Sequence, residues 1–207
     1  MVVDRLVERG HASWSALPKS AQQDLSSAIR GWRAAADEGL AYAQFNLGIM
    51  FEEGRGVVHS NDEAGHWYRK AADNGHDDAQ YNLGVMYRDG CGVPQSDIEA
   101  VRWLRRAADQ GHCHAQCNLG VIFQGGHGVA QNDAEAAQWY RKAADQGLDD
   151  AQCNLGVLFR DGCGVAQNGA EAVRWLRRAA DGGHSHAQCN LGVMFGSGRG
   201  VAQNDAE

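Results

Sequence analysis

The sequence is poor in proline and has no long apolar stretch. It contains two prolines against 27 glycines in 207 residues, and the glycines recur at fixed positions instead of forming a low-complexity tract. No run approaches the ~20 consecutive apolar residues that a membrane-spanning helix needs. The amino terminus carries charges, at Asp4, Arg5, Glu8 and Arg9, where a signal peptide needs its apolar stretch. We therefore expect a cytoplasmic protein.

An excess of basic residues is also missing. Lys and Arg together number 19 and Asp and Glu together number 26, which gives a formal net charge of −7. Proteins that bind nucleic acids or anionic membranes usually carry a basic patch on a basic domain. We therefore predict neither a nucleic acid nor a membrane among the partners of this chain.

What the sequence has in abundance is repetition. The hexapeptide Ala-Gln-x-Asn-Leu-Gly recurs every 36 residues without a slip in register. It begins at Ala43, Ala79, Ala115, Ala151 and Ala187. Internal periods of about 20–50 residues are typical of solenoids and propellers. The chain is therefore predicted to be a repeat protein.

The first half of each repeat reads as a helix that ends in a glycine loop. Ala79, Leu83 and Tyr87 recur at helical spacing and mark one buried stripe. Gly84 lies inside this helix at a cost of about 1 kcal/mol in helix propensity, which predicts that another helix approaches it closely. The Gly-x-Gly-Val loop that follows needs glycine because its turn requires positive φ. This loop begins at Gly54, Gly90, Gly126, Gly162 and Gly198.

The second half of each repeat reads as another helix. It opens with a polar residue and a glutamate three positions later, as in Ser60 and Glu63, which is the pattern of a capping box. Glycines such as Gly75 follow the last turn, where a left-handed cap is expected. Its buried stripe includes Ala100 and Leu104. A helical hairpin of this kind cannot bury both of its faces alone, so its stability must come from its neighbours.

The predicted fold is therefore all-α, an α-solenoid of 36-residue helical hairpins. Residues 1–23 are expected to form a divergent cap, and the solenoid is expected to cover residues 24–207. We place a partial repeat at 24–39, full repeats at about 40–75, 76–111, 112–147 and 148–183, and a truncated repeat at 184–207.

This pattern resembles the Sel-one-like (Sel1-like) repeat family, which is related to the tetratricopeptide solenoids. The resemblance rests on the 36-residue period, the Ala-Gln-x-x-Leu-Gly motif and the Gly-x-Gly-Val loop, and it covers nearly the whole chain from residue 24 onward. It implies a right-handed α–α superhelix whose first helices line a concave groove. It also implies an adaptor or scaffold in protein complexes, without catalysis of its own.

The six cysteines do not read as a disulfide framework. Cys117, Cys153 and Cys189 occupy the same position in successive repeats. Equivalent points in stacked helices lie roughly 8–10 Å apart, which exceeds the ~7 Å Cα separation that a disulfide tolerates. Cys91 and Cys163 are two repeats apart. We therefore expect reduced thiols, as in other proteins of a reducing compartment.

The asparagine of the repeated hexapeptide is the leading candidate for ligand contact. A side-chain amide offers both a donor and an acceptor to the backbone of an extended peptide. The alternative is that these amides cap or bridge neighbouring helices. The column consists of Asn46, Asn82, Asn118, Asn154 and Asn190.

Two further sets of residues are candidates for the same groove. Phe45 and Tyr81 precede the first two asparagines, and their rings are expected either to contact a ligand or to pack between first helices. Arg88 and Arg160 are expected either to bind ligand carboxylates or to be ordinary solvated charges. The arginines of the second helices are interpreted as a solvated face. They are Arg102, Arg105, Arg106, Arg174, Arg177 and Arg178.

One cluster has residue types that bind zinc, namely His112, Cys113, His114 and Cys117. The equivalent residues differ in the other repeats, and structural zinc sites usually show two separated ligand pairs. We predict no metal and no cofactor. No nucleophile–base pair or phosphate-binding loop recurs either, so we predict that the chain is not an enzyme.

Three functions stay open at this point. The first is a scaffold that binds a peptide or protein segment in the groove. The second is a structural module that assembles end to end through an uncapped last helix, with Leu191, Val193, Met194 and Phe195 as its contact residues. The third and least favoured is a β-lactam-binding enzyme like those of the cysteine-rich branch of the family. That branch has a second cysteine near the position of Ala108, which no repeat of this chain has.

Overall fold

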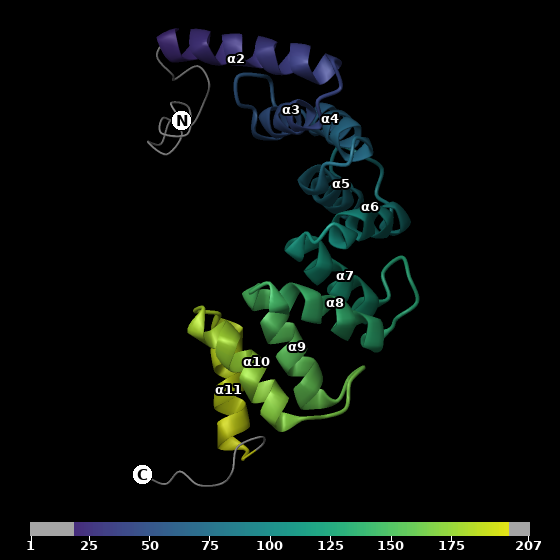
Figure 1. The fold of residues 1–207 in the computed structure, drawn as a ribbon, viewed down its shortest axis with the longest axis vertical. Coiled ribbons are helices and arrows are strands. Elements are labelled where there is room, and N and C mark those ends of the chain that lie inside the picture. Colours follow the sequence, from purple (N-terminus) through teal and green to yellow (C-terminus); the bar gives the residue numbers. More distant parts are fainter. Residues whose placement is uncertain (1–18, 199–207) are drawn as a thin grey trace. The chain divides into compact units, whose positions relative to one another are not determined.

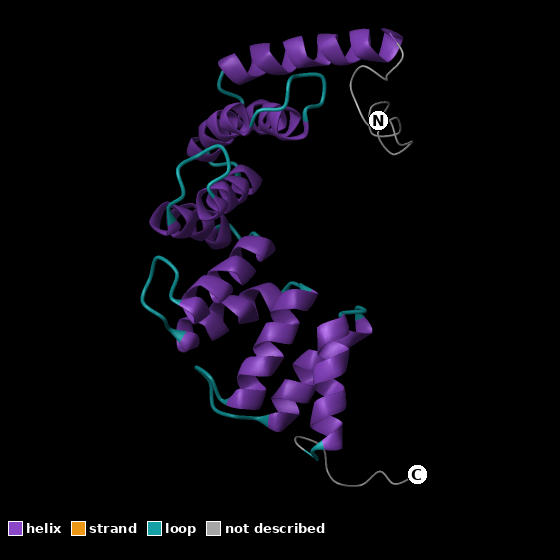
Figure 2. Cartoon of the chain, turned by 180° about the vertical axis from the view of Figure 1, so that it is seen from behind, coloured by secondary structure: helices purple, strands orange, loops and turns teal. Residues whose placement is uncertain are grey.

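The computed structural model describes residues 19–198, with side chains from Ser27 onward. In this range the fold consists of ten helices and contains no strand (Figures 1 and 2), which confirms the predicted all-α class. The helices are α2 (Lys19–Asp37), α3 (Ala41–Glu53), α4 (Asn61–Asp73), α5 (Asp77–Asp89), α6 (Asp97–Asp109), α7 (Cys113–Gly125), α8 (Asp133–Asp145), α9 (Asp149–Asp161), α10 (Gly169–Asp181) and α11 (Ser185–Gly196).

The helices group into two compact units that divide within α6, the first ending at Trp103 and the second starting at Leu104. In each unit the first and second helices of the repeats alternate along the chain. Helices that are consecutive in sequence pack side by side, as α3 does on α4 and α9 on α10 (Figure 1). Most of the predicted cap at 1–23 lies outside the described residues, and α2 begins at Lys19, before the predicted partial repeat.

The loops after the first helices have the predicted left-handed glycines. Gly54 has φ +67° and donates its N–H to the carbonyl of Met50, and Gly162 has φ +74°. The second glycine of the loop has a further reason to be small. A Cβ on Gly92 would lie 2.1 Å from the carbonyl oxygen of Asn61. The loop therefore packs directly on the start of the second helix of the preceding repeat.

The predicted polar caps of the second helices are confirmed. The hydroxyl of Ser60 accepts the N–H of Glu63 at 3.2 Å. The side-chain oxygen of Asn132 accepts the N–H of Glu135 at 3.1 Å, and Asn168 caps α10 in the same way. Asparagine thus replaces serine at this position without loss of the capping bond.

Three of the five mid-helix glycines lie where another helix comes close, as predicted, whereas Gly192 has nothing within 4 Å of an added Cβ among the described residues. A Cβ on Gly48 would meet the ring of Tyr68 at 2.5 Å, and a Cβ on Gly120 would meet the ring of Tyr140 at the same distance. In the fourth repeat a Cβ on Gly156 would lie 2.7 Å from Cγ of Leu176. Each of these three glycines therefore forms a shallow depression that receives the central side chain of its second helix.

The structure also shows a column of buried glutamines that the sequence analysis did not single out. Gln44, Gln116 and Gln152 are 4–6% exposed. Their amide nitrogens donate to carbonyl oxygens at the end of the preceding second helix, with Gln44 bonding to Ala36 at 3.0 Å. Each bond satisfies a carbonyl that a helix end leaves open and ties one repeat to the next.

The amide oxygens of these glutamines receive a bond from the following second helix. Asn74 donates to Gln44 at 2.9 Å, and Gln146 donates to Gln116 at 2.8 Å, in both cases from 30 residues further along. For Gln152 the equivalent position is Gly182, which has no side chain. The buried oxygen of Gln152 accordingly has no hydrogen-bond partner among the described residues.

Replacing Gly120 with Ala should lower the free energy of unfolding by about 1–3 kcal/mol, because the new methyl group overlaps the buried ring of Tyr140. The matched control is Gly31→Ala in α2, where nothing lies within 4 Å of the added Cβ and the gain in helix propensity is about 1 kcal/mol. Urea unfolding followed by circular dichroism measures both changes. Equal stabilisation by the two variants would contradict the close approach.

Replacing Gly182 with Gln should stabilise the protein, because the new amide restores the missing donor to Gln152. Gly182 has φ −73°, so a side chain there causes no backbone strain, although the carboxylate of Asp149 must rotate away. Gly182→Ala supplies the gain in helix propensity without the hydrogen bond. The Gln variant should exceed the Ala variant by about 1 kcal/mol in urea unfolding. Equal stability of the two variants would show that the bond does not form.

Candidate peptide-binding face

The five asparagines of the repeated hexapeptide lie at equivalent positions on the first helices, and the side chain of each is half-buried. Asn46 and Asn82 hold this position in the first unit, and Asn118, Asn154 and Asn190 hold it in the second. We call the three asparagines of the second unit, with the residues beside them on the same helices, the asparagine face. Half-burial leaves part of each amide exposed.

Asparagines at three positions bond to other residues of the chain. Asn46 donates to the carbonyl of Tyr42 at 2.7 Å, one turn earlier in α3. Asn190 donates to the carbonyl of His186 at 3.0 Å and accepts a bond from Arg160. Asn82 lies within hydrogen-bonding reach of a tyrosine hydroxyl on α4. At these positions the asparagine bonds within the chain, as the alternative interpretation of a capping or bridging amide predicts.

Asn118 and Asn154 differ from the others. Neither side chain forms a hydrogen bond to any residue that the structure describes, although both are half-buried. A half-buried amide without a partner loses part of its hydration and gains no protein bond in return. The two residues occupy the same position in α7 and α9, which are successive first helices of the second unit. They offer two donor–acceptor groups at a repeating interval.

An apolar residue lies one turn beyond each asparagine, and in the last repeat it is Val193, which the sequence analysis named for self-association. Val121 follows Asn118 and is 48% exposed, and Val157 follows Asn154 and is half-buried. The signal was available, because the same spacing holds in every repeat and places the side chain next to the amide. The full column is Ile49, Val85, Val121, Val157 and Val193.

The aromatic residues that precede the first asparagines pack inside the first unit. The ring of Phe45 stacks on His76 with 4.4 Å between centroids and lies 5.8 Å from Tyr68. Tyr81 is also half-buried. These contacts support the interpretation that the residue before the asparagine packs inside the repeats. In later repeats the same position holds the buried thiols of Cys117 and Cys153.

The two arginines of the candidate site are engaged by adjacent carboxylates. Nε of Arg88 donates to Asp89 at 2.7 Å, and Nε of Arg160 donates to Asp161 at 2.8 Å. The bond from Arg88 holds the pKa of the Asp89 carboxyl below its ordinary value. A ligand carboxylate at either arginine would have to compete with this neighbour.

An alternation over two repeats explains where these arginines occur. Arg88 and Arg160 share their repeat position with Glu52 and Gln124. In the first and third repeats the residue at this position accepts a hydrogen bond from a tyrosine hydroxyl of the second helix, Glu52 from Tyr68 and Gln124 from Tyr140 at 3.0 Å. In the second and fourth repeats the tyrosine is replaced by leucine, which needs no acceptor. This position then holds arginine.

The histidine–cysteine cluster has a structural role at the start of α7. Nδ1 of His112 accepts the N–H of Ala115 at 3.1 Å, so this histidine caps the helix. Among the residues described, the group with metal-like spacing is instead His76, Asp77 and Asp78 at the start of α5. Carboxylates are common at this end of a helix because they complement its dipole, so the group carries no metal assignment.

The four hydrophobic residues predicted for self-association divide into two pairs. Leu191 and Met194 are buried within the unit, at 8% and 1% exposure. Val193 and Phe195 are exposed, at 59% and 44%. Only the second pair is open to a contact from outside.

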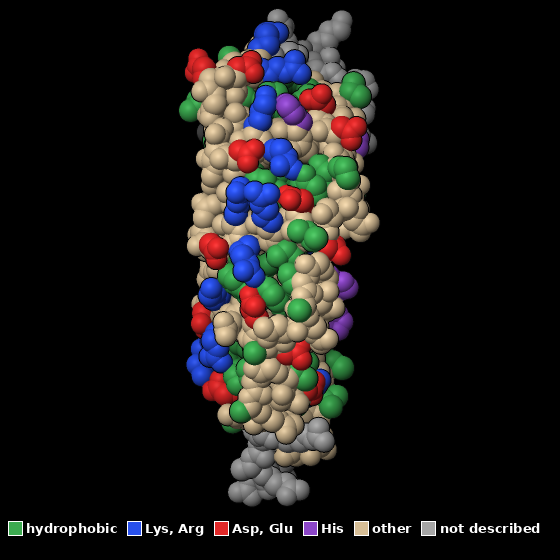
Figure 3. All heavy atoms as spheres, turned by 90° about the vertical axis from the view of Figure 1, so that its right-hand side faces the viewer, with side chains coloured by type: hydrophobic (Ala, Val, Ile, Leu, Met, Phe, Trp, Pro, Cys, Tyr) green, Lys and Arg blue, Asp and Glu red, His purple; other side chains and the backbone are tan. Residues whose placement is uncertain are grey.

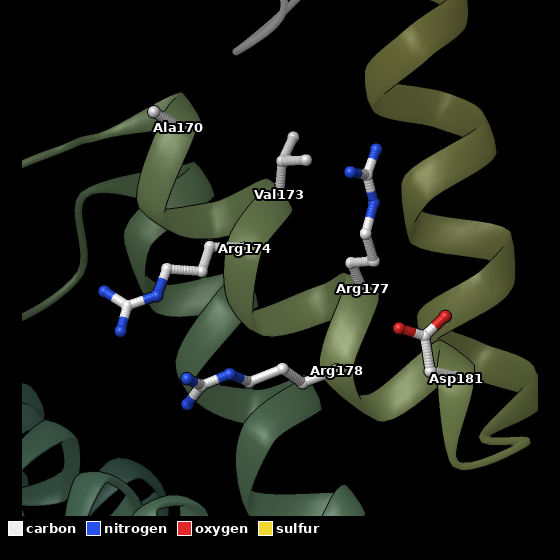
Figure 4. A pocket seen from close by; sticks show the side chains of 6 residues that line it. All are labelled: Ala170, Val173, Arg174, Arg177, Arg178 and Asp181. Atoms are coloured by element: carbon white, nitrogen blue, oxygen red, sulfur yellow. The ribbon is translucent and has the colours of Figure 1, made fainter.

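The arginines of the second helices are exposed, in agreement with the sequence interpretation, and several of them also contact aromatic rings. Arg105 lies over the ring of Phe123 at 5.5 Å and donates to Glu135 at 3.1 Å. Arg174 and Arg178 both lie over Trp175, at 5.5 and 4.8 Å, and extend side by side from α10 (Figure 4). Basic and acidic side chains are interspersed on the face drawn in Figure 3. These cations therefore cover aromatic surface as well as facing water.

The arginines of α10 also line a shallow pocket of about 480 Å³, together with Ala170, Val173 and Asp181 (Figure 4). All the lining residues come from this one helix.

No helix in the described part of the chain is both long and apolar enough to cross a bilayer.

Known proteins share this repeat. The sequence model of the Sel1 repeat matches residues 41–76, 77–112, 113–148, 149–184 and 185–207. The crystal structure of a protective antigen from uropathogenic Escherichia coli with an SLR fold is similar, with 38% identity and a TM-score of 0.83 over 87% of this chain. The match spans 38% of that antigen's length.

A second similar structure is a Sel1 repeat protein from Oxalobacter formigenes, with 31% identity and a TM-score of 0.78. This match covers 90% of the present chain and 79% of the Oxalobacter protein. No curated protein matches the chain.

Burial should make Cys117 inert toward alkylation. Burial, with smaller contributions from Asp150 and Cys113, raises the pKa of its thiol to about 12. An ordinary thiol has a pKa near ~8.5, and only the thiolate reacts. At pH 8 iodoacetamide should therefore label the exposed Cys189 roughly a thousandfold faster than Cys117 in the native protein. Peptide mass spectrometry measures the two rates.

In denaturant the two cysteines should react alike, because the difference comes from folding. Asp150→Asn removes a minor cause of the pKa shift, so Cys117 should stay slow in that variant. Fast labelling of Cys117 in the native wild-type protein would contradict its burial.

Proposed function

The chain belongs to the Sel1 repeat family, whose members generally act as protein-interaction scaffolds, and we propose that it binds an extended peptide segment of a partner protein on its asparagine face. It does so without catalysis, as is usual in this family. We place this function in the cytoplasm, because all six cysteines are free thiols and free thiols are typical of reducing compartments.

The observation that carries the proposal is the pair of uncommitted amides, Asn118 and Asn154. An extended peptide carries an N–H and a C=O at each residue, and a side-chain amide can bond to both. Amides at this position in other repeats are partly occupied by the chain itself. The α7–α9 segment of the second unit is therefore the centre of the proposed site.

The repeat suits an extended backbone. Asn118 and Asn154 hold the same position on successive first helices, so an extended peptide that runs along the face would meet one amide in each repeat. The partly exposed Val121 and Val157 lie beside the amides and supply apolar surface for the intervening side chains.

The test is a double substitution, Asn118→Ala with Asn154→Ala. Random linear peptides displayed on phage are selected on the purified wild-type chain, and a selected peptide is then titrated by calorimetry. Each lost hydrogen bond is worth about 1 kcal/mol, so the double variant should bind roughly 30-fold more weakly. Circular dichroism should show an unchanged fold, because neither amide bonds to the described residues.

The matched control is Gln138→Ala, which removes an exposed amide from the second helix α8. It should leave the affinity unchanged. Equal affinity of the wild type and the double asparagine variant, or a loss on Gln138→Ala instead, would place the ligand elsewhere.

A further inference from the structure

The first helices of the second unit carry few charged residues. Helices α7 and α11, as the structure describes them, contain no Lys, Arg, Asp or Glu. Helix α9 contains four such residues, which are Asp149, Asp150, Arg160 and Asp161. The other Lys and Arg residues in the described part of this unit all lie on second helices. The charge of the asparagine face therefore depends on α9.

Three of these four side chains are engaged within the chain. Nε of Arg160 donates to one carboxylate oxygen of Asp161 at 2.8 Å, and Nη2 donates to the other oxygen at 2.8 Å. In this bidentate pair one positive charge offsets one negative charge. The carboxylate of Asp149 faces Gly182, the residue that follows α10. The fourth side chain, Asp150, is the one that bears on the asparagine face.

Asp150 lies beside one of the two uncommitted amides. It precedes Asn154 by one turn of α9, so the two side chains are neighbours on the same side of the helix. In α11 the equivalent asparagine, Asn190, donates to the carbonyl of the equivalent residue, His186, at 3.0 Å. This bond shows how close the two positions are. The side chain of Asp150 is 69% exposed, so a ligand can reach its carboxylate.

The negative charge of Asp150 also acts on the residues that precede both amides. Burial has the largest effect on the thiols of Cys117 in α7 and Cys153 in α9, and the charge of Asp150 raises the pKa of both further. Cys117 precedes Asn118, and Cys153 precedes Asn154. The carboxylate therefore lies close to the centre of the proposed peptide site.

The hydrogen bond that Asp150 accepts does not remove its charge. Nε2 of His184, the N-cap residue of α11, lies 2.9 Å from Oδ1 of Asp150. Nδ1 of the same ring accepts the N–H of Ala187 at 3.2 Å, so the ring proton is on Nε2 and the imidazole is neutral. The bond orients the carboxylate, which keeps its negative charge.

We propose that the peptide bound on the asparagine face carries a Lys or Arg side chain that pairs with Asp150. This inference rests on the proposed function and names the kind of segment that the face selects. A basic side chain finds an exposed carboxylate beside the amides that hold the peptide backbone. An acidic side chain is repelled by Asp150, and Arg160 is already paired with Asp161. The partner segment is therefore basic.

The test uses two phage libraries of random peptides that differ in one fixed central residue, Lys in one and Glu in the other. When the two are mixed and selected on the wild-type chain, phage of the Lys library should be recovered in excess. Asp150→Lys should reverse this preference, because it exchanges attraction for repulsion. Sequencing of the recovered phage measures the ratio.

A peptide selected from the Lys library is then titrated by calorimetry at pH 8, where imidazoles are usually neutral. Asp150→Asn keeps an acceptor for His184 and removes the charge, so it should bind the peptide about three- to fivefold more weakly. The difference should shrink as salt is added, because exposed charges are screened.

Asp149→Asn is the matched control. It removes the same charge from the same turn of α9, on the side that faces Gly182. It should leave the affinity and the library preference unchanged, and circular dichroism should show that every variant is folded. A loss on Asp149→Asn as large as that on Asp150→Asn would reveal a general effect of net charge and would overturn the role of Asp150.

Failure of this inference can be distinguished from failure of the proposed function. If Asn118→Ala with Asn154→Ala weakens binding, but Asp150→Asn does not and the two libraries are recovered equally, the peptide site stands and its preference for basic segments is wrong. An excess of the Glu library on the wild type has the same meaning. If neither library yields a binder, or neither the asparagine variant nor Asp150→Asn weakens binding, both proposals are overturned.

Discussion

The close contact between a mid-helix glycine and the ring of the next helix sets the geometry of each repeat. At Gly48 and Gly120 an added methyl group would overlap a tyrosine ring, so no larger residue fits unless the helices separate. The contact fixes the position of the tyrosine hydroxyl beside the last turn of the first helix. A hydrogen-bond acceptor is therefore needed in that turn. Glu52 and Gln124 accept that hydroxyl, and arginine takes their place only where the ring is replaced by leucine.

The first helices carry two columns of side-chain amides, one of glutamines and one of asparagines, which differ in burial and in hydrogen bonding. Gln116 is buried, donates to a carbonyl of the preceding second helix and accepts from the following one. Asn118 lies two residues further along, about 200° around the helix, and it is half-buried without a partner among the described residues. The same chemical group thus holds repeats together on one side and is available to a ligand on the other.

Sequence periodicity alone was enough to determine the repeat, its two helices, the capping residues and the left-handed glycines. These features depend on local backbone chemistry, and each is written several times in the chain. The sequence also predicted that something packs on Gly84 and its equivalents, without saying what. Only the tertiary structure showed that a tyrosine or leucine of the second helix packs on three of these equivalents.

The state of each candidate site residue likewise depended on contacts between segments distant in sequence. Asn118 and Asn190 look identical in the repeat, yet one lacks a partner in the described chain and the other is bonded to Arg160. Phe45 packs on His76, and Leu191 is buried while Phe195 is exposed. A repeat sequence defines which positions are equivalent, and the neighbours that reach each position in space decide whether it is core, bridge or open surface, because hydrogen bonding and burial are properties of the assembled repeats.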